Sequence, residues 1–189
     1  HWEVVPGAMT SAKPAAAVAP TLAVRHLPNR DWGASYLRAA AGAWGIAARF
    51  DAAASDVLPP RDHLLVWLRP GPVPEAVADW IDAGGTALLG ADTTFAMPGG
   101  TLALWRDAGG SSLIEGGALG QGRVLRFTRA LTPQAMPELL EPEFAADLRK
   151  AIAPAPPPPA RVHASDYAPA AGVAPFPQPP LPLSAWLSV

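Results

Sequence analysis

The sequence predicts an α/β domain with a mostly parallel central β-sheet, and three features of residues 64–91 support this fold class. First, an unbroken apolar run from Leu64 to Leu68 is typical of a strand buried on both faces of a parallel sheet. Second, apolar side chains recur at helical spacing in the segment that follows, at Val73, Val77, Trp80 and Ile81. Third, another apolar run begins at Thr86, directly after a Gly-Gly pair that can end a helix. Residues 64–91 together therefore have about the length of a β–α–β unit, which is roughly 30 residues.

The flanking sequence predicts the remaining elements. Before this unit we expect a strand at residues 21–26, a helix at 32–44 and a strand at 46–50. After it we expect a loop at 92–100, short peripheral strands at 101–105 and 112–114, a glycine-rich turn at 116–122, a strand at 123–127, and helices starting near Thr132 and Pro142. The sequence therefore predicts a flavodoxin-like three-layer domain with about five mostly parallel strands.

The composition divides the chain into three parts. We expect residues 1–19 to form an irregular lead-in, residues 20–152 to form the α/β domain, and residues 153–189 to form a Pro/Ala-rich tether. Between Pro154 and Pro182, 11 of 29 residues are proline, and Arg161 and Asp166 are the only charged residues. Such a segment lacks the apolar residues for a core of its own and favours an extended spacer, at most ~90 Å long in polyproline II conformation.

Charge and cysteine content exclude several functions. The formal net charge is −2, which gives no electrostatic basis for binding nucleic acid or an anionic membrane surface. The chain has no cysteine, which excludes disulfides, cysteine-ligated zinc and a thiol nucleophile. The acidic residues Glu138, Glu141, Glu143 and Asp147 are typical of a helix surface near an amino-terminal end. No metal or cofactor is therefore predicted.

Candidate site residues follow from the predicted sheet. Ligands of open parallel sheets bind outside the carboxyl ends of the strands, where this sequence offers six polar candidates: His26, Asp31, Arg69, Asp92, Thr93 and Thr94. Asp92 with His26 or His63 could form an acid–base pair, and Thr93 or Thr94 could supply a nucleophilic hydroxyl. In the alternative interpretation, Asp92 and the threonines cap a turn and the histidines only end strands.

Two other patterns favour a structural interpretation. Residues 117–122 are glycine-rich like a phosphate-binding loop, but they precede a strand instead of opening a helix, so we expect a hairpin turn. Arg123, Arg126 and Arg129 could clamp an anion. Because Arg123 and Arg126 face opposite sides of a strand, a solvated sheet edge is the expected interpretation.

Both ends of the chain suggest a membrane context. The sequence begins with His1 instead of Met, Trp2 lies near the start, and hydrophobicity rises around Trp186. An extracytoplasmic segment between two membrane spans would have these features. A plain domain with an apolar tail is the alternative.

Two stretches resemble known families. Residues 62–90, which contain Asp62-His-Leu-Leu-Val-Trp-Leu and end in Gly-Gly-Thr-Ala-Leu-Leu-Gly, resemble a segment of class I glutamine amidotransferase-like domains. Residues 120–144 and the Pro-rich end before Trp186 are similar to the extracytoplasmic region of BatA-like membrane proteins. Those proteins have an amino-terminal double-transmembrane region and are associated with aerotolerance operons.

The resemblance implies a function without catalysis. Glutamine amidotransferases use a cysteine on a Gly-x-Cys-x-Gly elbow, and this chain has neither, so no functional residue carries over. The implied protein is a non-catalytic interaction or sensing domain on the periplasmic side of a bacterial inner membrane, with von Willebrand A or MoxR-associated partners. The alternative is a small hydrolase or esterase-like enzyme that uses Asp92, Thr93 and His26 or His63. A small-ligand sensor would use the same crevice without chemistry.

Overall fold

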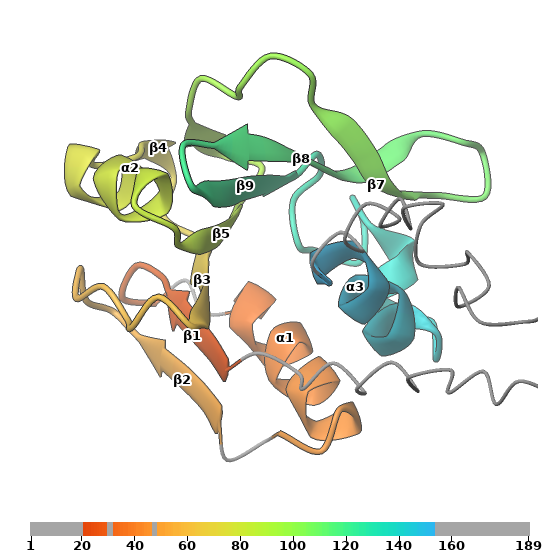
Figure 1. Cartoon of the computed structure of the whole chain (residues 1–189). Coiled ribbons are helices and arrows are strands. Elements are labelled where there is room, and N and C mark those ends of the chain that lie inside the picture. Colours follow the sequence, from red (N-terminus) through yellow and green to blue (C-terminus); the bar gives the residue numbers. More distant parts are fainter. Residues whose placement is uncertain (1–20, 30–31, 47–48, 154–189) are drawn as a thin grey trace, which may run out of the picture. The chain divides into compact units, whose positions relative to one another are not determined.

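The computed structural model describes residues 21–29, 32–46 and 49–153. A seven-stranded sheet with the strand order β2-β1-β3-β5-β9-β8-β7 forms its centre (Figure 1). These strands are β1 (Thr21–Arg25), β2 (Phe50–Ala53), β3 (His63–Trp67), β5 (Thr86–Leu89), β7 (Leu102–Arg106), β8 (Ser112–Leu119) and β9 (Gly122–Phe127). Two further short strands, β4 (Gly71–Pro72) and β6 (Thr93–Thr94), pair with each other.

Five neighbouring strands are parallel. β2, β1, β3, β5 and β9 all run in the same direction. At one edge of this group, β8 pairs antiparallel with β9, and β7 pairs antiparallel with β8. The prediction of an α/β domain with a mostly parallel central sheet is therefore confirmed. Of the two strands predicted to be short and peripheral, β7 is the edge strand, whereas β8 lies between β7 and β9 and is eight residues long.

Helices cover both faces of the sheet. The helices are α1 (Trp32–Ala43), α2 (Glu75–Asp82) and α3 (Phe144–Ile152), and a 3₁₀ turn, η2 (Pro137–Leu140), precedes α3. On one face, α1 and α3 pack with Leu64, Val66 and Leu125. On the other face, Val77, Trp80 and Ile81 of α2 pack with Leu65, Trp67 and Ala87. This alternation along β3 explains its unbroken apolar run, since every side chain meets a helix layer.

The central β3–α2–β5 prediction is correct to within a few residues. Helix α2 ends before Gly84, which adopts a left-handed conformation with φ of 110°. The buried side chains of α2 are three of the four predicted ones, and the fourth, Val73, precedes the helix and packs against the same cluster. The apolar pattern thus predicted both the helix and the face that it buries.

Four local predictions were wrong. The strand predicted at 46–50 lies at 50–53 instead. The sequence signal was weak there, because β2 is a partly exposed edge strand with only Phe50 as a large apolar residue. Gly116 and Gly117, assigned to a turn, belong to β8, and the turn forms around Gly120 and Gln121 instead. Residues 132–136 form a turn before η2 instead of a helix from Thr132. The loop expected at 92–100 contains β6.

All described residues lie in the first of the two units into which the chain divides, residues 1–154. The predicted lead-in (1–19) and all of the predicted tether (153–189) except Ala153 fall outside the described residues. Within the described ranges, no helix has both the length and the apolar character needed to cross a bilayer.

Candidate functional site

A cavity of about 220 Å³ opens at the carboxyl edge of the parallel strands. Three loops form its wall: residues 68–70 after β3, residues 90–93 after β5, and residues 130–132, which follow β9. Gly33, in the first turn of α1, completes the lining. β1 leads into α1 on one face of the sheet and β3 leads into α2 on the other, so the connections that follow these two neighbouring parallel strands leave the sheet on opposite sides. Open α/β sheets favour this position for ligands.

The short ladder β4–β6 fixes the two main loops of the cavity relative to each other. The Gly71 N–H donates to the Asp92 carbonyl oxygen at 2.9 Å, and the Val73 N–H donates to the Thr94 carbonyl oxygen at 3.2 Å. The loop after β3 is therefore tied to the loop after β5 by backbone hydrogen bonds. This ladder was not predicted, because two-residue strands carry no periodic signal.

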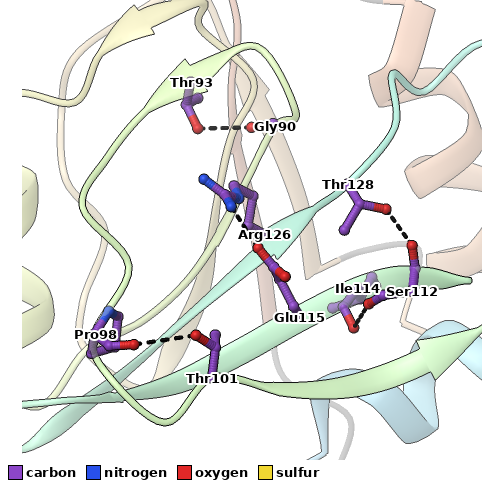
Figure 2. Close-up of polar contacts among 9 residues, drawn as sticks. All are labelled: Gly90, Thr93, Pro98, Thr101, Ser112, Ile114, Glu115, Arg126 and Thr128. Atoms are coloured by element: carbon purple, nitrogen blue, oxygen red, sulfur yellow. Dashed lines mark hydrogen bonds and ion pairs between the residues drawn. The ribbon is translucent and has the colours of Figure 1, made fainter.

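Thr93 is buried, with 6% of its surface exposed. Its Oγ1 donates a hydrogen bond to the carbonyl oxygen of Gly90 at 2.7 Å (Figure 2). The Gly90 N–H in turn donates to Trp67 O at 2.8 Å, which connects the loop to the end of β3. The hydroxyl proton of Thr93 thus closes a turn, and the hydroxyl oxygen keeps acceptor capacity.

Arg69 lines the cavity with a partly buried side chain. Its guanidinium forms an ion pair with the carboxylate of Asp56. The same guanidinium lies over the Trp67 ring, with its central carbon 5.4 Å from the ring centroid. The positive charge of Arg69 is therefore compensated within the protein.

Asp92 forms an exposed part of the cavity wall. Its backbone oxygen accepts the hydrogen bond from Gly71 that belongs to the ladder. Among the described residues, its carboxylate has neither an ion-pair partner nor a hydrogen-bond donor. Asp92 is thus the charge in the cavity wall that has no compensating group in the described part of the chain.

Gly33 allows α1 to approach the loops closely. A Cβ at this position would lie 3.1 Å from Leu131 Cβ and 3.3 Å from Leu68 Cδ1. Any larger residue would push the first turn of α1 away from the two loops that it contacts. The missing side chain at residue 33 therefore shapes one wall of the cavity.

The structure brings three of the six candidates together. Arg69, Asp92 and Thr93 line the cavity. Thr94 is exposed and serves in the β4–β6 ladder. His26 follows β1 at the same edge, but it is not part of the lining, and its Nδ1 lies 2.9 Å from Leu27 O. Asp31 lies outside the described residues.

The proposed pairing of Asp92 with His63 is wrong. His63 is the first residue of β3, at the amino edge of the sheet, whereas Asp92 follows the carboxyl end of β5. In parallel strands these positions lie at opposite edges. Within the described ranges, no hydrogen bond joins the Thr93 hydroxyl to an imidazole.

Sequence reasoning missed the loop after β9. Ala130, Leu131 and Thr132 line the cavity, yet the sequence pattern indicated Thr132 only as the start of a helix. The signal was present, because the rule about carboxyl ends applies to the last parallel strand as well as to the first four. Recognising residues 123–127 as an interior parallel strand would have nominated these three residues.

The three arginines near β9 do not form an anion clamp, and β9 is not a sheet edge, since it lies between β5 and β8. Arg126 Nη2 bonds to Glu115 Oε1 at 2.5 Å across the strands (Figure 2), and Arg129 Nη2 bonds to Asp107 Oδ2 at 2.7 Å. The Arg123 guanidinium donates to Ala153 O at 3.0 Å, and burial lowers the pKa of Arg123. Each arginine therefore has a structural partner.

A fourth arginine, Arg25 at the end of β1, is buried and was not singled out from the sequence. Its Nε donates to Val57 O at 2.8 Å, and its Nη1 lies 2.9 Å from Asp51 Oδ2. It connects β1 to β2 and to the segment before β3. Its role is structural, because its donors serve other parts of the fold.

No protein-family model, curated protein or solved structure matches this chain. The site must therefore be interpreted from its own geometry. Among the described residues, no group of three or more histidine or acidic side chains could hold a metal ion. What the cavity offers is a small, largely apolar space with a compensated guanidinium, an uncompensated carboxylate and a hydroxyl oxygen.

Proposed function

We propose that this chain is a non-catalytic sensing or interaction domain on the periplasmic side of a bacterial inner membrane, and that it binds its ligand in the carboxyl-edge cavity. The observation that carries the proposal is the hydrogen bond made by the Thr93 hydroxyl. Its hydroxyl donates to Gly90 O, so the candidate nucleophile is used to close a loop. Binding needs only a shaped cavity with a few polar groups, which is what this edge of the sheet offers.

The finer fold assignment is part of the same proposal. The five parallel strands follow the order β2-β1-β3-β5-β9, which corresponds to the 2-1-3-4-5 order of flavodoxin-like domains. This order supports a flavodoxin-like, glutamine amidotransferase-like domain. The resemblance of residues 120–144 to BatA-like proteins supports the periplasmic location and partners of the von Willebrand A or MoxR-associated type.

A small hydrolase is the second candidate, because Asp92 and Thr93 share one cavity. Such an enzyme would need His26 to turn towards them, as the imidazole now lies against Leu27 O. Hydrolysis of p-nitrophenyl esters tests it. Turnover that is abolished in both Thr93→Ala and His26→Ala supports the hydrolase, and no turnover above that of these variants supports the binding domain.

A reporter fusion tests the location. The turn between β7 and β8 contains Gly109 and Gly110, both exposed, and no heavy atom lies within 4 Å of an added Cβ at Gly110. Alkaline phosphatase, which is active only outside the cytoplasm, is inserted there in the protein expressed in its native cell. We expect phosphatase activity. A matched insertion of β-galactosidase, which is active in the cytoplasm, should be inactive, and the reverse pattern contradicts the proposal.

A further inference from the structure

We infer that the carboxyl-edge cavity takes a small primary ammonium compound with a short apolar arm, and that Asp92 binds its charge. This inference rests on the proposed function, since it names the ligand class of the same cavity. Size, charge and hydrogen-bonding capacity each favour this class.

The size of the cavity limits the ligand. Its volume of about 220 Å³ is below the ~300–1,000 Å³ that is usual for pockets of drug-sized ligands. Much of the wall is apolar, with Leu68, Pro70 and Leu131 contributing. The space therefore suits a short hydrocarbon arm, with one polar head group at the exposed part of the wall.

The charges favour a cation. One guanidinium, Arg69, is compensated by Asp56 outside the lining, while Asp92 has no compensating group among the described residues. The three side chains together carry one net negative charge. The first turn of α1 opposes a cation with a partial positive charge of about half a unit, which is smaller than the full charge of a carboxylate. An ammonium ion therefore gains more from this site than a carboxylate or a phosphate would.

The hydrogen-bonding capacity of the cavity wall also favours an ammonium ion. An ionised aspartate only accepts hydrogen bonds, and the Thr93 proton is already donated to Gly90 O. Both groups thus offer acceptors, whereas an ammonium ion has three donors and no acceptor. An anion would need a donor with an uncompensated positive charge, and the charge of the Arg69 guanidinium is already paired with Asp56, while the group packs on Trp67.

The test is a titration of the full 189-residue chain, followed by amide NMR shifts. The probes are n-butylammonium, its neutral analogue 1-butanol and its anionic analogue pentanoate. We expect saturable shifts at Gly33, Ala91 and Leu131 with butylammonium only. Because an ion pair with an exposed carboxylate contributes up to ~1 kcal/mol, Asp92→Asn should weaken this binding about two- to fivefold. The matched control, Asp79→Asn on the exposed face of α2, should leave it unchanged.

One further probe and a comparison with the reporter fusion complete the test. Nα-acetyl-lysine amide tests the source of the ammonium: binding as tight as that of butylammonium assigns it to a lysine side chain, and no binding assigns it to a free amine. Equal shifts from all three probes, shifts from pentanoate alone, absence of saturable shifts, or unchanged binding by a folded Asp92→Asn variant would overturn the inference. A negative titration alongside an active periplasmic reporter refutes the ligand class alone.

Discussion

The hydroxyl of Thr93 donates to the carbonyl oxygen of Gly90, three residues earlier, at 2.7 Å. This hydrogen bond lies inside the loop that carries Asp92, so it sets the position of the only uncompensated charge among the described residues of the cavity wall. A side chain that the sequence suggested as a nucleophile thus acts as a structural part of the candidate site.

Thr93→Val should lower the free energy of unfolding by about 1–2 kcal/mol, because it keeps the shape of the side chain and leaves the buried Gly90 carbonyl without this donor. Urea denaturation followed by tryptophan fluorescence measures the change. Thr93→Ser, which keeps the hydroxyl, should lose less stability than Thr93→Val. A larger loss in Thr93→Ser would show that the methyl group, and not the hydrogen bond, determines the stability of this loop.

Gly85→Ala should destabilise the domain by about 1–3 kcal/mol. A Cβ at residue 85 would overlap the Trp80 ring, which is held in place by a hydrogen bond from its Nε1 to Pro59 O at 2.9 Å. The matched control is Gly42→Ala in α1, where an added Cβ meets no atom within 4 Å. That control should be stabilised by about 0.5–1 kcal/mol, because alanine favours the helix. Equal effects of the two substitutions in thermal denaturation would contradict the packing of Trp80.

Replacing Arg25 tests the connection between β1, β2 and the segment before β3. Arg25→Met should cost about 2 kcal/mol of unfolding free energy, since Val57 O and Asp51 both lose their donor. Arg25→Lys keeps the charge but not the forked geometry that serves both acceptors, so it should recover only part of this loss. Full recovery in chemical denaturation would mean that charge alone matters at this site.

The stability of the turn between β7 and β8 should depend on pH through Asp107. The Arg129 guanidinium hydrogen bond, with the Ser111 N–H, holds the pKa of Asp107 below its ordinary value of 3.8. A depressed folded-state pKa stabilises the protein above the unfolded-state pKa, and this contribution is lost as the pH falls through the folded-state pKa.

The stability difference between the unmodified protein and Asp107→Asn should therefore be constant from about pH 5 to 7 and should shrink below about pH 3.9. Denaturation curves at a series of pH values measure it. Asp79→Asn is the control, because Asp79 is exposed and its carboxylate accepts no hydrogen bond from the described residues. A difference that grows as the pH falls would contradict the Asp107–Arg129 hydrogen bond.

The sequence predicted those parts of the fold whose signal is local. The apolar runs of β3 and β5 and the stripe of α2 are such signals, and the structure confirms them within a few residues. Strand β8 gave such a signal only at its start, in residues 112–114. Gly116 and Gly117 belong to it because they pair with Leu125 and Val124 of β9. A Cβ added at these two glycines would lie 3.0 Å from Leu104 Cδ1 and 3.1 Å from Pro98 Cγ, respectively. Those neighbours come from β7 and the preceding loop, and only tertiary contacts show them.

The candidate site was predicted in part for the same reason. The rule about carboxyl ends nominated Arg69, Asp92 and Thr93, and the cavity contains all three. The rule does not say which nominated groups already have partners. The Arg69–Asp56 pair and the Thr93–Gly90 hydrogen bond depend on loop conformations that the sequence pattern does not encode. His63 was misplaced because a strand has two ends and only one of them faces the site.

The absence of cysteine from the chain permits a direct test of the central claim, that this domain lies outside the cytoplasm. Leu140→Cys introduces a single thiol at a side chain that is 69% exposed, and Ala87→Cys introduces one at a fully buried position. Intact cells expressing each variant are treated with a membrane-impermeant maleimide. We predict that the Leu140→Cys variant is labelled in intact cells and that the Ala87→Cys variant is labelled only after denaturation. Labelling of the Leu140→Cys variant only after the inner membrane is broken would place the domain in the cytoplasm and contradict the account.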